Sequence, residues 1–317
     1  MDATASQTLT RDWVHPSFGR RVFLFFRYSR VFWAWVFLAP TLVTLLVVAG
    51  YPLWGTFWLS FTDAQLLTLE QGASFVGLAN YSAVLSDPDW WVALRNTLLF
   101  SSISVVLETL LGLGIALVLN AEFRGRALLR AAVLIPWAIP TVISAKMWTW
   151  MYNDMYGVVN AGLLALGWIS EPIAWLSGAG TAMAALIAVD VWKTTPFMAL
   201  LILAGLQLIS KDVYEAARID SDSRTRVFWS ITLPLLKPTI AVAVIFRALD
   251  ALRVFDLFYV LTGSKVDTGT VTIYARQRLM EFQEFGLGSA ASVLIFLFIG
   301  SFTVLYLWMM RPKGSEA

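Results

Sequence analysis

The sequence predicts an all-α, polytopic membrane protein with six transmembrane helices, on three observations. The 317-residue chain is 58% hydrophobic and only 14% charged, with a mean hydropathy of +0.71, whereas soluble domains are about half apolar and about a quarter charged. Six mainly apolar segments reach the length of about 20 residues that a helix needs to cross a bilayer. Lys and Arg are concentrated in alternate loops, as in multi-pass proteins.

The spans are expected to be helical, because the bilayer core offers no water to free backbone groups. The short alternating strands of a membrane barrel are not visible in the sequence. We expect the first span to be uncleaved, since its apolar run is too long for a signal-peptide core and no small-residue cleavage pattern closes it. The predicted spans are residues 31–60, 95–120, 132–153, 181–206, 238–262 and 287–311.

The distribution of Lys and Arg predicts the orientation of these spans. Of the Lys and Arg residues outside the spans, fifteen lie in the N-terminal segment, the loops 121–131 and 207–237, and the tail. Only three lie in the remaining loops. Both termini are therefore expected in the cytoplasm. The predicted organisation is a basic cytoplasmic segment 1–30, a six-helix transmembrane domain 31–311 that includes a long inward loop 207–237, and a cytoplasmic tail 312–317.

Composition also limits the chemistry. The chain has no Cys, which excludes disulfides and thiol chemistry. Its single His, His15, lies in the basic N-terminal segment, so a histidine metal site or catalytic triad is implausible. The net charge of +2 gives no indication of a nucleic-acid partner, and we predict none.

The inward loop carries the densest run of charge in the chain and predicts two short helices. In "QLISKDVYEAARID", Lys211 and Glu215 are four residues apart and share a polar face. A break follows at "DSDS". The second helix, "RTRVFWSI", leads to Pro234 and Pro238, which are expected to redirect the chain into the fifth span. Small residues and exposed charge suit docking to a soluble protein, although an ordinary solvated loop has the same features.

The same loop contains a longer pattern: Glu-Ala-Ala-x-x-Asp at 215–220, then Phe-x-x-Ile-x-Leu-Pro at 228–234, then Pro238. At this place between the spans it resembles the EAA loop of ABC-importer permeases. Most of the chain is similar to the maltose/trehalose-type sugar permeases, those related to the larger maltose permease subunit. This wider similarity is carried by "FVGLANYSAVL", "ALRNTLLFS", "LIPWAIPTVISAKMWTWMYN", "VWKTTPFMALLILAGLQLI" and "FDLFYVLTG".

The resemblance implies the type I ABC importer permease fold and a loop that seats on a cytoplasmic ATPase. Glu215 would be its acidic anchor, with two alanines as close-packing positions. After the turn Asp the family usually has Gly-Ala, where this chain has Ser221-Asp222; Ser reaches the glycine conformation at a cost of about 1 kcal/mol or more. Asp220 and Ser221 are alternatively caps of the second helix. The residues that match the coupling loop are Glu215, Ala216, Ala217, Asp220, Ser221, Phe228, Leu233 and Pro234.

The resemblance also implies partners. These are a second homologous permease, two copies of a cytoplasmic ABC ATPase and an extracytoplasmic sugar-binding protein, in a bacterial or archaeal cytoplasmic membrane. The chain has no P-loop of the form GxxxxGK[ST]. We therefore expect it not to be an enzyme and to bind no cofactor directly, with ATP and Mg on the partner ATPase.

Charged residues inside the predicted spans form two groups, in "DVWKTTPF" and in "FRALDALRVFD". At membrane depth such residues are costly and face the bundle interior, either as interhelical pairs or as a polar substrate path, and both interpretations stay open. At about 100° per residue the second row spirals around its helix, so Arg247 and Asp256 lie on nearly opposite faces and the row is not expected to line one cavity. The candidate path residues are Asp190, Trp192, Lys193, Thr194, Phe197, Arg247, Asp250, Arg253 and Asp256.

A sugar path needs polar groups for hydroxyls and aromatic faces for C–H surfaces. Asp250 and Arg253 fit the first need, and Trp192, Phe197 and Phe258 fit the second. The resemblance places substrate contacts in the spans that flank the EAA loop, and the positions matching polar sugar contacts carry charged residues here.

Four further residues stand out inside the spans. Glu108 and Lys146 are expected to form interhelical pairs, with each other or with the charged groups. Gly112 and Gly114 are expected to permit close helix crossing.

The sequence therefore predicts the permease subunit of an ATP-driven importer of a di- or oligosaccharide, with trehalose or maltose favoured. Within that class, the alternative is uptake of glycerol phosphate or a polyol. Outside it, an ion-coupled carrier or channel would use the span charges as ion relays, and a membrane-embedded enzyme would use a carboxylate such as Asp190 or Asp256.

Overall fold

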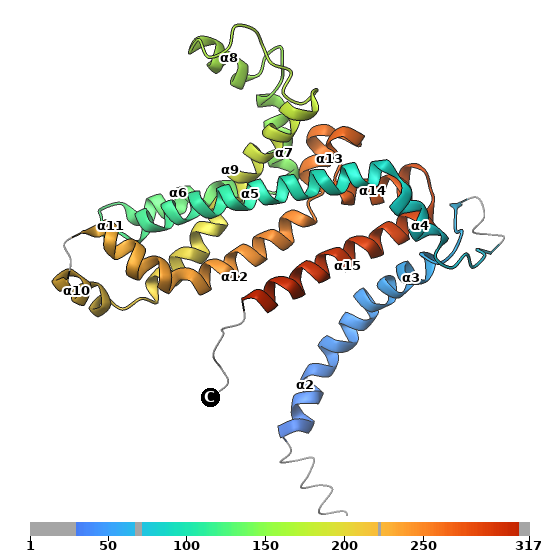
Figure 1. Ribbon diagram of the computed structural model, residues 1–317, viewed down its shortest axis with the longest axis horizontal. Helices are drawn as coiled ribbons and strands as arrows, with labels where there is room; N and C mark the ends of the chain where they lie inside the picture. Colours follow the sequence, from blue (N-terminus) through green and yellow to red (C-terminus); the bar gives the residue numbers. More distant parts are fainter. Residues whose placement is uncertain (1–29, 67–71, 221–222, 311–317) are drawn as a thin grey trace, which may run out of the picture. The chain divides into compact units, whose positions relative to one another are not determined.

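The computed structural model describes residues 30–66, 72–220 and 223–310 (Figure 1). The side chains of Ala179, Arg218 and Asp220 also lie outside the described structure. The described residues are almost entirely helical, with one isolated antiparallel bridge between Thr62 and Phe75. The all-α prediction is thus confirmed. The chain divides into two compact units, Met1–Gly55 and Thr56–Ala317.

The first unit holds an apolar helix. α2 (Arg30–Leu45) continues through a π-helical turn (Leu46–Gly50) into α3 (Tyr51–Leu59), whose end belongs to the second unit. α2 buries no residue, and large side chains such as Trp35 and Phe37 are exposed along it. A helix that is apolar all round is typical of a membrane span, in agreement with the predicted first span.

Four of the other predicted spans correspond to long helices of the second unit. They are α5 (Pro88–Asn120), α9 (Ala179–Gln207), α12 (Leu233–Leu252) and α15 (Phe285–Met309). Among the described residues, five helices are long and apolar enough to cross a membrane, or up to six if one bent pair is a single span. α5 begins seven residues before the predicted span because Asp87 caps it, accepting a hydrogen bond from the Asp89 backbone N–H at 2.9 Å, and Pro88 suits the first turn.

The predicted third span is the bent pair. α6 (Arg126–Ala138) and α7 (Thr141–Met151) meet at an angle of 89°, and Figure 1 shows the two running in different directions. Ile139 at the bend has an extended backbone, as expected for a residue that precedes a proline, here Pro140. The predicted span 132–153 is therefore formed by two helices that are interrupted at Ile139 and Pro140.

The second inward helix and the fifth span are one helix rather than two. α11 (Arg224–Val227), a π-helical turn (Phe228–Thr232) and α12 form a continuous stretch of 29 residues. Pro234 lies in the first turn of α12, where a missing N–H is tolerated. The expected redirection at Pro234 and Pro238 is therefore wrong. The helix ends at Leu252, ten residues earlier than predicted, and α13 (Asp256–Thr262) follows.

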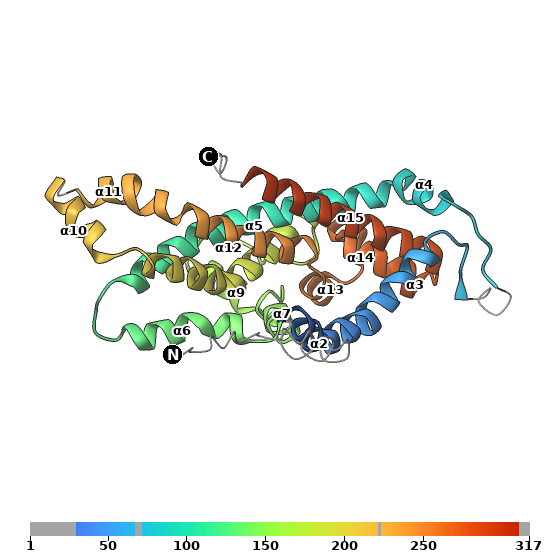
Figure 2. The same cartoon turned by 90° about the horizontal axis from the view of Figure 1, so that it is seen from below.

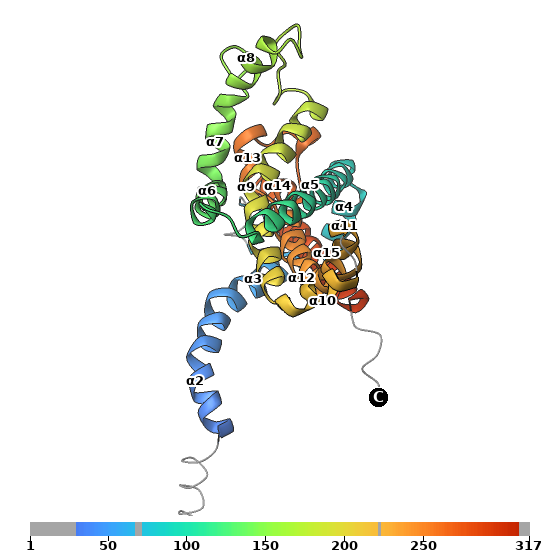
Figure 3. The same ribbon diagram turned by 90° about the vertical axis from the view of Figure 1, so that its left-hand side faces the viewer.

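α9 is the centre of the second unit. It contacts α5, α6 and α12, and Figures 2 and 3 show it between α6–α7 on one side and α12 on the other. A Cβ added to Gly112 of α5 would lie 2.9 Å from the Met198 Cβ of α9, whereas one added to Gly114 would meet nothing within 4 Å. The predicted close crossing is thus confirmed at Gly112 and wrong at Gly114.

Shorter elements complete the unit. The loops that the Lys and Arg count assigns to the outside contain α4 (Ala79–Ser86), α8 (Val158–Ala165), a 3₁₀ turn (Val266–Thr268), α14 (Val271–Arg276) and a π-helical turn (Gln277–Glu281). α10 (Lys211–Asp220) occupies the inward loop, close to the expected 207–220.

Candidate functional site

A buried arginine joins three of the long helices. Arg247 of α12 donates from Nε to Glu108 Oε2 of α5 at 2.5 Å and from Nη2 to Glu108 Oε1 at 3.0 Å. The same Nη2 donates to Asp190 of α9. The Arg247 side chain is 2% exposed and that of Glu108 is 0% exposed. We call Glu108, Asp190, Thr194 and Arg247 the buried cluster.

Two members of the buried cluster, Asp190 and Thr194, lie on α9, and helix periodicity brings them to the same face. Asp190 and Thr194 are four residues apart and therefore share a face. The Thr194 hydroxyl lies 2.7 Å from the Asp190 carbonyl oxygen of its own helix and 2.5 Å from Glu108 Oε1 of α5. The expected interhelical pair at Glu108 is thus confirmed, with the charged groups of spans four and five as its partners. Lys146 is exposed on α7, and no ion pair of the described residues includes it, so its expected pairing is wrong.

The charges follow α12 from the buried cluster toward the surface. Arg247 Nη1 donates to Asp250 Oδ2 at 3.2 Å, and Asp250 Oδ1 lies 3.8 Å from Arg253 Nη2. The Asp250 side chain is 61% exposed and that of Arg253 is 69% exposed. Arg247 and Asp250 are three residues apart in the sequence, as are Asp250 and Arg253, and this spacing predicts that each pair lies side by side.

A pocket of about 260 Å³ opens beside the buried cluster. Seven of the nine predicted path residues line it, all except the two aromatic residues. Its lining is Trp137, Thr141, Asp190, Lys193, Thr194, Arg247, Asp250, Arg253, Val254, Phe255, Asp256 and Leu257.

The pocket corrects the expectation that the charged row of span five cannot line one cavity. Arg247, Asp250, Arg253 and Asp256 all line the same pocket. The spiral argument assumes one continuous helix, but α12 ends at Leu252 and α13 begins at Asp256. The intervening residues leave helical geometry, so Asp256 is turned back toward the face that carries Arg247.

The expected aromatic residues lie elsewhere. Trp192 packs edge-to-face against Trp148 at 5.5 Å, and Phe258 is fully buried against Phe100. Phe197 stacks on Trp137 at 5.8 Å, and it is Trp137 that reaches the pocket. Trp137 and Thr141 flank the bend between α6 and α7. A sequence pattern that does not predict this bend cannot place them at the pocket.

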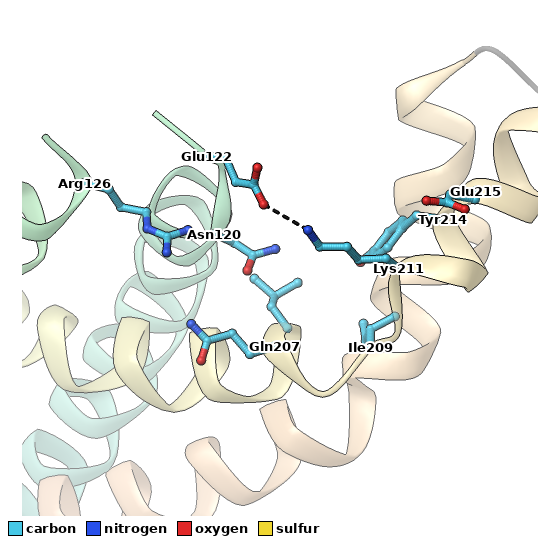
Figure 4. A pocket seen from close by; sticks show the side chains of 9 residues that line it. Asn120, Glu122, Arg126, Gln207, Ile209, Lys211, Tyr214 and Glu215 are labelled. Carbon is cyan, nitrogen blue, oxygen red and sulfur yellow. Dashed lines mark hydrogen bonds and ion pairs between the residues drawn. The ribbon is translucent and has the colours of Figure 1, made fainter. Parts of the chain in front are cut away.

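The inward loop forms a second candidate site, around α10. Glu215 and Ala216 are exposed, whereas Ala217 is buried. Lys211 and Glu215 share the face that lines a cleft of about 740 Å³ together with Tyr214, confirming that they share a polar face (Figure 4). The ion pair of Lys211 is made across the cleft, with Glu122 Oε1 at 3.1 Å.

Other predicted coupling residues follow α10. Phe228 and Leu233 are half-buried and Pro234 is exposed. The N-cap of α11 is Ser223, whose side chain accepts from the Arg226 N–H at 3.4 Å, whereas the sequence suggested Asp220 and Ser221 as alternative caps. Ser221 itself and the side chain of Asp220 lie outside the described residues.

The two sites differ from a metal-dependent active site. Among the residues that the structure describes, no group of three or more His, Cys, Asp or Glu side chains is placed to hold a metal ion. The chain has a polar pocket between membrane-spanning helices and a charged helix between two spans. They define a multi-pass membrane transport protein.

The chain belongs to the family of binding-protein-dependent transport system inner membrane components, which matches residues 108–311. It is therefore a transport component of a membrane permease and not itself an enzyme. It is 47% identical over 290 residues to the trehalose/maltose transport system permease protein of Thermococcus litoralis, covering 90% of this chain and 96% of that one. It is 40% identical over 278 residues to the sulfoquinovosyl glycerol transport system permease protein of Agrobacterium fabrum, covering 87% and 89%.

The fold has a counterpart among solved structures. A chain of a bacterial ABC transporter involved in the import of the acidic polysaccharide alginate superposes with a TM-score of 0.79, at 22% identity, over 92% of this chain and 99% of that one. The similarity shows that the two share the type I ABC importer permease fold.

Proposed function

We propose that this chain is a permease subunit of an ATP-driven importer and forms part of the path for a di- or oligosaccharide, with trehalose or maltose as the favoured substrates. The pocket where α12 ends carries the proposal, because it brings charged groups from α9, α12 and α13 to one opening. The relative at 47% identity transports trehalose and maltose by its name.

The chemistry of the pocket suits a neutral sugar. Outside the buried cluster its charged lining is Lys193, Asp250, Arg253 and Asp256, two cations and two anions. These groups offer donors and acceptors to hydroxyls while adding no net charge. Trp137, with 46% of its surface exposed, supplies an aromatic face for sugar C–H groups.

The size of the pocket indicates how much of the substrate this chain holds. Its volume of about 260 Å³ is below the range of about 300–1,000 Å³ typical of small-molecule sites. We infer that a second, homologous permease completes the site and that one chain contacts only part of a disaccharide.

The coupling part of the proposal rests on α10. Glu215 is exposed at the edge of the cleft, whereas Ala217 of the same helix is buried. A pair of cytoplasmic ATPase subunits, which would hold ATP and Mg, is proposed to bind this helix. An extracytoplasmic sugar-binding protein is proposed to deliver substrate to the opposite side.

The test is sugar-stimulated ATP hydrolysis by the co-purified complex in liposomes. We expect stimulation by the binding protein loaded with trehalose or maltose. Transport by this chain alone, without an ATPase, would refute the proposal and favour an ion-coupled carrier. Sulfoquinovosyl glycerol should be tested beside these sugars. A relative at 40% identity is named for it, and the cations Lys193 and Arg253 suit a sulfonated sugar.

A single substitution tests the pocket. Asp250→Asn is expected to weaken sugar uptake about tenfold or more, because it removes about one charge-assisted hydrogen bond to the sugar. The transporter complex should still assemble. The matched control is Asp154→Asn on an exposed loop residue away from the pocket. Loss of the folded complex in Asp250→Asn would instead show that this carboxylate is chiefly a structural partner of Arg247.

A further inference from the structure

The buried cluster has an unbalanced charge if every carboxyl group is ionised. Glu108 and Asp190 would supply two negative charges, and Arg247 supplies one positive charge. The side chains of Glu108 and Arg247 are 0% and 2% exposed, and that of Asp190 is 9% exposed. An unpaired charge at this depth is costly, and a carboxyl group in that position is neutralised by taking up a proton.

The Thr194 hydroxyl points to the same conclusion from geometry alone. Its oxygen lies 2.7 Å from the Asp190 carbonyl oxygen and 2.5 Å from Glu108 Oε1. A hydroxyl has one hydrogen to donate and two lone pairs that accept. Both short contacts are hydrogen bonds only if Thr194 donates to one neighbour and accepts from the other. A carbonyl oxygen has no hydrogen, so the donor to Thr194 is Glu108.

We propose that the buried cluster is a proton-binding site, with the proton on Glu108 Oε1. The Glu108 hydroxyl donates to Thr194 Oγ1, and Thr194 donates to the Asp190 carbonyl oxygen in the preceding turn. Glu108 Oε2 accepts from Arg247 Nε, a lone pair of Oε1 accepts from Arg247 Nη2 at 3.0 Å, and the Asp190 carboxylate balances the guanidinium. One cation and one anion remain, and the junction of α5, α9 and α12 is neutral.

Most of the other charged groups around the site are exposed to water. Lys193 of α9 is half-buried on the pocket side, and it interacts electrostatically with Asp190 and Asp250 but lies beyond ion-pair distance of both. Asp250 reaches Arg247 but is 61% exposed, so water solvates its charge, and Arg253 lies beside it. Asp256 lines the pocket, and Lys146 on α7 is exposed.

The matched substitution is Glu108→Gln in the full-length chain purified from membranes. A glutamine amide has the shape of the protonated acid, donates to Thr194 and accepts from Arg247. We expect its thermal midpoint at neutral pH to stay within about 2 °C of the parent. The double variant Glu108→Gln with Asp190→Asn leaves Arg247 without a buried anion and should lose about 6 °C or more. Failure of Glu108→Gln to fold, or an unchanged double variant, would overturn the proposal.

Infrared spectroscopy observes the proton directly. The parent should show the carbonyl stretch of a protonated carboxylic acid near neutral pH, and Glu108→Gln should lack it. Asp190→Asn should lack it too, because Glu108 then ionises to balance Arg247. Because the folded chain holds a proton that the unfolded chain releases, the parent should lose stability as pH rises. The stability of Glu108→Gln should not show this dependence on pH. A parent without the band, or a band that persists in Glu108→Gln, would show that Glu108 is an ordinary ionised partner.

Discussion

Two of the Glu–cation pairs among the described residues lie in opposite environments. Arg247 and Glu108 are 2.5 Å apart with side chains 2% and 0% exposed, whereas Lys211 and Glu122 are 3.1 Å apart with side chains 84% and 79% exposed. Water and salt screen the second pair, so it contributes little to stability. The first is closed to water, and removal of Arg247 would leave the buried Asp190 carboxylate without its cation. Environment, and not contact distance, decides what each pair does.

The difference also separates two roles in the proposed transport cycle. The buried cluster joins α5, α9 and α12 and therefore holds the helices that surround the pocket. α10 exposes the carboxylates of Asp212 and Glu215 to water, where another protein could reach them. In the proposed function, a rigid junction beside the pocket and an accessible helix at the membrane surface are what a coupled permease requires.

Replacing the buried arginine is expected to have the largest effect. Arg247→Gln removes the cation that pairs with Asp190 in the closed interior, and we expect a loss of about 3–5 kcal/mol in unfolding free energy. Thermal unfolding of the solubilised chain measures it. Arg253→Gln is the control, since this arginine is 69% exposed and should change little. Equal effects of the two substitutions would contradict the contrast between buried and exposed charge.

Reversing the charge of α10 is expected to affect activity without affecting stability. Glu215→Lys should lower sugar-stimulated ATP hydrolysis tenfold or more, an amount equal to about 1.4 kcal/mol, because the proposed ATPase contact would meet the wrong charge. The unfolding midpoint should not change, since Glu215 is exposed. Asp212→Lys on the same helix is the control, and an equal loss there would assign the effect to total charge. Unchanged coupling in Glu215→Lys would count against the docking role.

A packing substitution tests the buried region independently of charge. Gly112→Ala would place a Cβ 2.9 Å from the Met198 Cβ and 3.1 Å from the Ala199 backbone nitrogen. Because backbone atoms must move, we expect a loss of about 1–3 kcal/mol, measured by thermal unfolding. Gly114→Ala two residues along meets open space and should be neutral or slightly stabilising. Equal losses in the two variants would show that α9 does not approach α5 as closely as described.

The sequence predicts features that depend on local spacing. The spans follow from hydropathy, and the relation of Arg247 to Asp250 follows from their separation by three residues on one helix. Glu108 stands out because a charge within a span needs a partner. The identity of that partner, 139 residues away on α12, depends on how α5, α9 and α12 pack, and no local pattern contains it.

The breaks between helices are what the sequence analysis misses. The residues around Leu252 in "ALDALRVFDLF" include neither Gly nor Pro, so no helix breaker marks the end of α12. The pocket forms at this break, and Trp137 reaches it only because the chain bends by 89° between α6 and α7. The charged residues of the site were therefore predictable one by one, but the cavity that joins them was not.

The exposed pair is expected to give the smallest effect. The hydrogen bond and the charge of Lys211 lower the pKa of Glu122. A lowered pKa means that the pair stabilises the folded chain above the ordinary carboxyl range, near about 4.3, and that its contribution is lost as pH falls through the lowered value. Glu122→Gln should thus be indistinguishable from the parent at acidic pH and nearly so at neutral pH. Thermal unfolding from neutral to acidic pH, at low and high salt, measures this. A large, salt-resistant loss at neutral pH would mean that water does not screen the pair, and the contrast with Arg247 and Glu108 would fail.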